Sequence, residues 1–359
     1  MASRAKHDWL MVRLGDVCHL KYGKALKKEE RVAGEFPVFG SAGSVGSHVE
    51  ANFVGPVSVV GRKGSAGFVE WSSGNCWIID TAFGVFPKSE EQVDSRWLYW
   101  LLKDLRLGRL QKHAAVPGIS KADVVEEKFL LPPLDEQRRI AAILDAVAES
   151  IAAVKSQLAE LSAIPFSMSN QKTQLIALSE LVDIRSSQVD PTSEPYLTMP
   201  HVAPNNLYSG SDEIVGVKSA AEDGVTSGKY AFKSGDILYS KIRPYLNKVS
   251  VAAYDGVCSA DMYALVPRDI KQTDWIVWQL RSSRFLAYAA ASSGRASIPK
   301  INRKTLGAFK VQVADPTVLE RFNREQSTKK SLADSMRRKL NLFQKLQESL
   351  STRAFQGEL

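Results

Sequence analysis

Cysteine is scarce in this chain of 359 residues, and its three copies, Cys18, Cys76 and Cys258, lie far apart with no CxxC pair. This usage excludes a disulfide framework and favours a reducing compartment. The five histidines are scattered and form no HExxH motif, so a metal site has no support in the sequence. A signal-peptide core and a run of about 18 apolar residues are both missing, so we expect a cytoplasmic protein with no membrane partner.

The sequence also lacks the short motifs of several enzyme classes. It contains no GxxxxGK[ST] phosphate loop, no NPPY motif of amino-methyltransferases and no GxSxG nucleophile elbow. Asp123, Glu126 and Lys128 form a D-x-x-E-x-K string that a nuclease could use, but without a distant acidic partner we interpret them as solvated charges. These absences favour a protein without a catalytic site. A self-contained nuclease or methyltransferase is the competing hypothesis.

The charge balance is moderately basic. The formal net charge is +8 and the pI about 9.2, while hydrophobic and charged contents of 44% and 24% are ordinary for a globular protein. This excess permits an anionic partner such as DNA without requiring one.

Several features recur at a separation of half the chain length. The matching pairs are Trp97 with Trp275, Ile119 with Ile298, and Pro87 with Pro267, which lie 178, 179 and 180 residues apart. A solenoid repeat is only roughly 20–50 residues long, so the pattern predicts two similar domains. We expect strand-rich regions at 10–133 and 174–314, with shorter helices at 96–112 and 274–291.

Each half ends in a long amphipathic helix. The first follows Pro133, with Asp135 as the expected N-cap, and the second begins at Asp315-Pro316, with Asp at the N-cap and Pro at the first helical position. Apolar residues recur at heptad-like steps. The expected seam residues are Ile143, Val147, Ile151, Val154 and Leu158 in the first helix, continuing to Leu161, and Leu332, Met336, Leu340 and Phe343 in the second, continuing to Leu346 and Leu350. Burying one stripe against the other predicts an antiparallel coiled coil. The alternative is that each helix packs only on its own domain.

Both halves carry basic segments rich in small or polar residues. Small residues let the backbone approach a phosphate, and Arg and Lys can reach phosphates or the acceptors of guanine. The candidate DNA-binding residues are Lys21, Lys24, Arg62, Lys63, Ser65, His113 and Lys121 in the first half, and Lys241, Arg243, Tyr245, Asn247, Lys248, Arg295, Lys300 and Arg303 in the second. Solvated hairpin loops are the plain alternative, but matching positions in both halves favour contact with DNA.

Three motifs resemble the specificity (S) subunit of type I restriction–modification systems. Residues 131–145, which begin Leu131-Pro132-Pro133-Leu134-Asp135-Glu136-Gln137, are similar to the family's PPL-x-EQ approach to its first conserved helix. Residues 235–245, from Gly235 to Tyr245, and the closing segment Ala354-Phe355-Gln356-Gly357-Glu358-Leu359 also resemble family patterns. The sequence departs from the family pattern at one point: the second helix begins without the Pro-Pro-Leu-x-Glu-Gln motif. We therefore expect the second partner contact to differ from the first.

The resemblance implies an α+β fold with two similar strand-rich target-recognition domains and two long conserved helices, which form an antiparallel coiled coil in a pseudo-twofold internal repeat. The implied domains are residues 1–133 and 169–314, and the implied helical segments are 134–168 and 315–359. Each domain would read one half of a split double-stranded DNA site. The helices would set the spacer and dock two modification (methyltransferase) subunits, which would carry S-adenosylmethionine, so no cofactor is expected on this chain. A restriction/translocase subunit joins some such complexes. The alternatives are a protein-binding coiled-coil scaffold and a DNA-reading module of another defence system.

Overall fold

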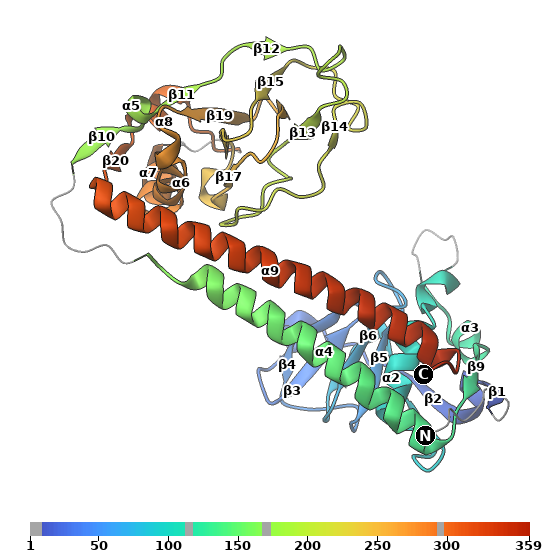
Figure 1. Ribbon diagram of the computed structural model, residues 1–359. Coiled ribbons are helices and arrows are strands. Elements are labelled where there is room, and N and C mark those ends of the chain that lie inside the picture. The colour runs from blue at the N-terminus through green and yellow to red at the C-terminus, as the bar shows by residue number, and fades with distance from the viewer. Residues whose placement is uncertain (1–8, 112–117, 167–173, 293–297) are drawn as a thin grey trace. The chain divides into compact units, whose positions relative to one another are not determined.

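The strands repeat in the same order in two parts of the chain. The computed structural model describes residues 9–111, 118–166, 174–292 and 298–359, and the chain divides into two units (Figure 1). Unit 1 comprises Met1–Ser162 and Asp334–Leu359, and unit 2 comprises Ala163–Ala333. Each unit mixes helices and strands, so the predicted α+β class is confirmed.

Unit 1 is built on a four-stranded antiparallel sheet. Its strands pair in the order β2 (Cys18–Tyr22), β8 (Ala82–Pro87), β5 (Val57–Gly61) and β6 (Val69–Ser72). The other pairings are β3 (Phe36–Gly40) with both β4 (Gly43–His48) and β7 (Trp77–Ile78), and β1 (Leu10–Arg13) with β9 (Lys128–Leu131). The helices are α1 (Leu14–Val17), α2 (Ser95–Asp104) and α3 (Lys121–Val125), with 3-10 turns at Lys28–Glu30 and Leu107–Leu110.

Unit 2 repeats this plan. Its four-stranded sheet has the equivalent order β11 (Val182–Ile184), β19 (Met262–Pro267), β16 (Ile237–Ser240) and β17 (Val249–Val251). A second sheet contains β12 (Gln188–Val189), β15 (Lys229–Phe232), β18 (Gly256–Cys258), β13 (Pro200–Val202) and β14 (Lys218–Ser219), and a ribbon joins β10 (Leu175–Ala177) to β20 (Lys310–Gln312). The helices are α5 (Leu178–Leu181), α6 (Thr273–Arg281), α7 (Ser283–Ser292) and α8 (Arg303–Ala308), with 3-10 turns at Pro244–Leu246 and Ile270–Gln272.

The two shorter helices differ from their predicted ranges. The helix expected at 96–112 ends at Asp104, because Arg106 adopts a left-handed conformation (φ 47°) that turns Leu107 into the core. The helix expected at 274–291 is two helices, α6 and α7. Ser282 adopts an extended conformation between them, and its hydroxyl donates to the Gln279 carbonyl and accepts from the Phe285 amide. Local backbone conformation and capping hydrogen bonds therefore determine where these helices end, in place of the apolar periodicity from which their ranges were predicted.

The two long helices are α4 (Leu134–Ala163) and α9 (Pro316–Phe355). The α4 helix begins one residue before the predicted cap Asp135, and the amides of Glu136 and Gln137 donate to the Pro133 carbonyl. The α9 helix begins as predicted, because the Asp315 carboxylate accepts from the Thr317 amide at 2.9 Å. Hydrogen bonds from the hydroxyl and amide of Thr317 lower the pKa of Asp315.

The inward-facing rows of these helices differ in detail from the predicted seams. On α4 the row is Ile140, Leu144, Val147, Ile151, Val154, Leu158 and Leu161, so Leu144 is fully buried while the predicted Ile143 is only partly buried. On α9 the partly buried row is Ala333, Met336, Leu340, Phe343, Gln347 and Leu350. Leu332 and Leu346 are each 44% exposed. Their assignment to the seam was wrong, because each lies one residue before an inward position in the 3-4 alternation of a heptad.

In unit 1, the C-terminal part of α9 packs antiparallel to α4 (Figure 1). Leu350 and Ala354 of α9 share one hydrophobic core with Ile140 and Leu144 of α4. The helices therefore bury one apolar stripe against the other at this end, as the sequence predicted, while the supercoil of a coiled coil stays a prediction.

In each unit, one buried tryptophan packs against aromatic residues at or near the ends of the long helices. Trp97 of α2 is fully buried, and its ring centroid lies 6.0 Å from that of Phe355 at the end of α9. Trp275 of α6 is equally buried, 6.2 Å from Phe166, which follows α4, and 5.0 Å from Phe322 near the start of α9. The repeated tryptophans are thus docking points for the long helices.

All three cysteines are buried and free. Burial raises the pKa of the Cys18 and Cys258 thiols to about 12 and also raises that of Cys76. They are structural residues of the cores and have little thiolate at neutral pH.

Replacing Phe355 with Ala should lower the free energy of unfolding by roughly 1–3 kcal/mol, because the partly buried ring leaves a gap beside Trp97. Urea unfolding followed by tryptophan fluorescence would measure this loss. Leu342→Ala is the matched control, since Leu342 lies on the same helix and is 68% exposed, and it should change stability by less than about 0.5 kcal/mol. Equal effects of the two substitutions would contradict the docking role of Phe355.

Candidate nucleic-acid interface

Each unit carries a basic turn directly after the third strand of its four-stranded sheet. The first basic turn is residues 62–67, between β5 and β6, and the second basic turn is residues 241–248, between β16 and β17. Because the two sheets share one strand order, the turns occupy equivalent positions in the two units.

Backbone hydrogen bonds define this equivalence residue by residue. The amides of Arg62 and Lys241 donate to the residue just before β8 or β19, namely Thr81 at 2.8 Å and Asp261 at 3.0 Å. The carbonyls of Arg62 and Lys241 accept from Ile119 at 3.0 Å and Ile301 at 2.9 Å. The predicted match of Ile119 with Ile298 is therefore wrong by three residues. The structure instead aligns Ile119 with Ile301, and so Lys121 with Arg303.

In the first basic turn, the arginine is held by aromatic rings. The guanidinium of Arg62 lies 4.9 Å from the ring centroid of Tyr22 and 5.9 Å from that of Phe83, and it donates to the Asp80 carbonyl at 3.2 Å. Lys63 lies 4.0 Å from the Asp80 carboxylate. The turn therefore presents two positive charges whose positions are fixed by stacking and by one acidic residue.

The other predicted residues of the first half are spread around this turn. Ser65 is exposed on the turn, and Lys121 begins α3, three residues after Gly118, which forms a β-bridge with Lys63. Lys21 and Lys24 contact other aromatic rings, those of Phe86 and Trp77, at 5.1 and 5.9 Å. Alternation along β2 directs Lys21 to the face opposite Tyr22. The structure thus groups Arg62, Lys63, Ser65 and Lys121 but not Lys21 or Lys24, and His113 lies outside the described residues.

The second basic turn has a more irregular backbone. Arg243 and Asn247 have φ values of 47° and 50°, and the Arg243 amide donates to the Pro299 carbonyl at 2.8 Å. Lys241 lies 5.6 Å from the ring centroid of Tyr263, the counterpart of Phe83. Arg243 and Tyr245 are exposed, with 54% of Tyr245 accessible. Both exposed side chains are free to reach a partner.

The remaining residues predicted in the second half lie beside this turn. Lys300 forms an ion pair with Asp261 at 3.2 Å, and the Arg303 guanidinium lies 5.7 Å from the ring centroid of Tyr263 and 5.9 Å from that of Tyr230. Burial raises the pKa of Tyr263, and the charge of Arg303 opposes that rise. Lys241, Lys300 and Arg303 therefore form one basic cluster, while Arg295 lies outside the described residues.

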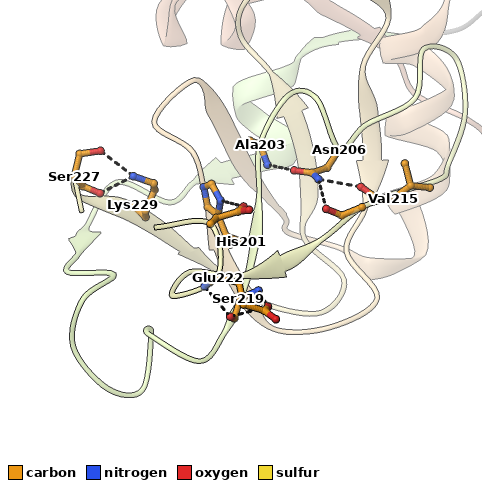
Figure 2. A network of polar contacts seen from close by, with 10 residues as sticks. His201, Ala203, Asn206, Val215, Ser219, Glu222, Ser227 and Lys229 are labelled. Carbon is orange, nitrogen blue, oxygen red and sulfur yellow. Dashed lines mark hydrogen bonds and ion pairs between the residues drawn. The ribbon is translucent and has the colours of Figure 1, made fainter. Parts of the chain in front are cut away.

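A loop that the sequence did not single out, residues 203–216, packs against the second basic turn. Figure 2 shows its closure by Asn206, whose side chain accepts from the Ala203 amide and donates to the carbonyls of Val215 and Gly216. Asn206 is buried, so this closure is shielded from water. The hydrogen bonds give the loop a fixed shape.

Three further bonds tie this loop to the turn and its strand. Lys248 donates to the Pro204 carbonyl at 2.6 Å, the Gly210 amide donates to the Asn247 carbonyl at 2.9 Å, and Ser250 donates to the Asp212 carbonyl at 2.6 Å. Lys248, predicted as a DNA contact, therefore uses its ammonium to position the loop. A cavity of about 280 Å³ lies between loop and turn, lined in part by Asn205, Arg243, Lys248 and Asp261.

Within the described residues, no group of three or more His, Cys, Asp or Glu side chains could hold a metal ion. In the same part of the chain, no helix has the length and apolar character needed to cross a bilayer.

Residues 6–163 match the family model described as the type I restriction modification DNA specificity domain. Over 408 aligned positions the chain is 26% identical to the type I restriction enzyme EcoDI specificity subunit of Escherichia coli, covering 100% of this chain and 90% of that protein. The first half of the chain therefore carries a type I restriction modification DNA specificity domain, and the whole chain is similar to a type I specificity subunit. Because its relatives are named specificity subunits, the predicted resemblance to such a subunit, rather than to an enzyme, is confirmed.

Two solved structures share the fold of this chain. The S subunit of a type I restriction–modification system from M. genitalium gives a TM-score of 0.62 at 16% identity, covering 99% of this chain and 98% of that chain. A chain from a study of complex assembly and conformational transition of the type I system gives 0.51 at 18% identity, covering 98% of both chains.

The PPL-x-EQ segment of this chain has a structural role inside unit 1. Gln137 is fully buried, and its side chain accepts from the Asp94 amide at 2.8 Å and donates to the carbonyls of Gln92 and Pro132 at 2.9 Å each. The glutamine thus fixes the start of α4 against the segment that precedes α2.

Sequence reasoning missed two acidic residues of the interface. Asp80 lies two residues before β8 and Asp261 one residue before β19, and they pair with Lys63 and Lys300, respectively. The repeat offered a signal, because the match of Pro87 with Pro267 brings these two residues within one position of each other. The loop at 203–216 had no such signal, since no equivalent loop was recognisable in the first half.

Replacing Lys248 with Met should loosen the loop at 203–216, because the ammonium bond to the Pro204 carbonyl is lost from a partly buried site. Hydrogen exchange measured by mass spectrometry should show roughly tenfold faster exchange at Gly210 and its neighbours. Lys233→Met, which removes an exposed lysine of the same unit, is the control and should leave that exchange unchanged. Unchanged protection in the Lys248 variant would show that the loop does not depend on this bond.

Proposed function

We propose that this protein is a specificity subunit that reads a bipartite double-stranded DNA target, one half with each unit, and has no catalytic role of its own. The observation that carries the proposal is the repeated basic turn, held by equivalent backbone bonds around Arg62 and Lys241. A scaffold that bound only protein would have no use for two matching basic clusters beside exposed turns.

The chemistry of the turns suits a nucleic acid. Lysine and arginine position a duplex through its phosphates, and an arginine can also read guanine in the major groove. Stacking of Arg62 on Tyr22 reduces the freedom that its side chain would lose on binding. Because the two units belong to one chain, binding of the first half-site raises the effective concentration of the second unit at the other.

The long helices fit the roles of ruler and docking surface. At 1.5 Å per residue, the 30 residues of α4 and 40 residues of α9 are about 45 and 60 Å long. Such lengths can span half-sites about one turn of DNA apart, roughly 34–36 Å. Leu332, Leu342 and Leu346 of α9 are exposed apolar residues, which suits docking of another protein.

In the proposed complex, two modification subunits dock on these helices and carry S-adenosylmethionine and the methyl-transfer chemistry. A restriction/translocase subunit joins where the system has one. The proposed DNA target implies a cytoplasmic location.

Deleting the gene should abolish genomic methylation at one bipartite motif with a fixed gap, as measured by single-molecule sequencing. On restoring the gene, Arg62→Ala or Lys63→Ala should weaken selection of one half of the motif, and Lys241→Ala or Arg243→Ala that of the other half. Each loss should be about tenfold, the usual size of one good base or phosphate contact. Arg268→Ala, which breaks an exposed ion pair with Asp183 in unit 2, should leave the motif unchanged. Unaltered methylation on deletion would overturn the proposal, and loss of both halves from one substitution would overturn its modular form.

Inserting one heptad into both α4 and α9 should lengthen the unread gap by about three base pairs, because seven helical residues add about 10.5 Å. The same methylation sequencing would measure the gap. A heptad in α9 alone shifts its inward row relative to α4 and should abolish methylation. A motif with its original gap after the double insertion would remove the ruler role.

A further inference from the structure

The cavity beside the second basic turn contains a carboxylate where a surface built only for phosphates would have none. Asp261 lines it together with Asn205, Arg243 and Lys248. A carboxylate repels phosphate groups, so its presence among three basic or neutral polar side chains needs a reason other than affinity for the DNA backbone.

Stability does not supply that reason. The ion pair between Lys300 and Asp261 leaves 54% and 42% of the two side chains exposed, and exposed pairs contribute little to folding. Lys300 bonds only Oδ1, and among the described residues Oδ2 accepts no hydrogen bond. The acidic side chain therefore keeps an acceptor available at the cavity.

The loop at 203–216 forms another part of the cavity lining, and it carries a second group that can accept a hydrogen bond. Asn205 is exposed and precedes Asn206, whose three hydrogen bonds close the loop (Figure 2). Lys248 binds the carbonyl of Pro204, the residue just before Asn205. The amide of Asn205 is thus presented from a backbone fixed on both sides.

The bases differ in what they offer to such acceptors. In the major groove, cytosine and adenine present an exocyclic amino group that donates, whereas thymine and guanine present acceptors at the corresponding positions. An ionised carboxylate accepts but cannot donate. A carboxylate in this position would therefore admit an amino-bearing base and repel the oxygen of thymine or guanine.

We propose that this cavity is a base-reading subsite of unit 2, in which Asp261, aided by Asn205, selects an amino-bearing base, cytosine or adenine, in the second half-site. Lys248 is a positioning residue of this subsite. The inference rests on the proposed function, because it presumes that unit 2 contacts base edges.

The test is selection from a library of randomised DNA duplexes by the full chain assembled with its modification subunits, followed by sequencing of the bound duplexes. The wild-type chain should select cytosine or adenine at one position of the second half-site that Asp261→Ala makes degenerate, with at least a tenfold loss of preference. Asp261→Asn should admit thymine or guanine there, because an amide can also donate. Asn205→Ala should weaken preference at the same or the adjacent position.

Two control variants separate base reading from the ion pair and from folding. Lys300→Met removes the pair but keeps the carboxylate, so affinity should fall for all sequences while the base preference stays. Asp183→Ala breaks the exposed pair with Arg268 and should leave the selected motif unchanged.

The outcomes distinguish failure of the proposed function from failure of the subsite alone. If the wild-type chain selects no bipartite motif, the proposed function fails and this subsite fails with it. If it selects a motif but Asp261→Ala leaves every position unchanged, or relaxes a thymine or guanine, only the subsite is overturned. A loss of preference in Lys300→Met equal to that in Asp261→Ala would show that the ion pair, not the carboxylate, sets the base choice.

Discussion

The docking of the long helices on a buried tryptophan is the contact on which the rest of each unit depends. Trp97 packs against Phe355 in unit 1, and Trp275 packs against Phe166 and Phe322 in unit 2. The helices that carry these tryptophans, α2 and α6, also pack on the four-stranded sheets. The basic turns project from strands of those same sheets. A large, fully buried ring at this junction therefore couples the long helices to the platform that presents the basic side chains, and its loss would disturb both.

The two basic turns reach a left-handed backbone by different residues. Unit 1 uses glycine, with φ values of 71° at Gly64 and 85° at Gly67, and a side chain at Gly67 would lie 2.1 Å from the backbone of Gly108. Unit 2 places Arg243 and Asn247 in this region, where a side chain costs about 1–2 kcal/mol per residue. Hydrogen bonds from the Arg243 amide to Pro299 and from the Gly210 amide to the Asn247 carbonyl help to hold that conformation. The second basic turn therefore has an arginine side chain at a left-handed position. The first basic turn has glycine, with no side chain, at its left-handed positions.

The sequence predicts the repeat, the α+β class and the pairing of the long helices, because each depends on patterns that recur along the chain. The basic segments that contain Arg62 and Lys241 were predicted to match in the two halves, and the shared strand order and equivalent backbone hydrogen bonds confirm that match. Details that depend on packing between distant residues were missed. Leu332 and Leu346 satisfy a loose apolar periodicity, yet the strict 3-4 alternation turns their neighbours inward. The loop at 203–216 is defined by bonds to a turn about 40 residues later, which no local pattern encodes.

The structure also gives a different interpretation of the missing PPL-x-EQ motif at the start of α9. Gln137, the glutamine of the PPL-x-EQ segment, is fully buried and bonded within unit 1, so its side chain is not accessible to a partner subunit. In unit 2, two hydrogen bonds and an ion pair join α9 and the segment before it to α6 and the segment before α6. Asn323 donates to the Lys271 carbonyl, Lys330 pairs with Asp274, and the Trp275 indole donates to the Gln312 carbonyl just before the helix. The missing motif is thus replaced by different bonds with the same internal purpose. The absence of the motif therefore gives no reason to expect that the two partner contacts differ. Any such difference has to come from the exposed faces of α4 and α9.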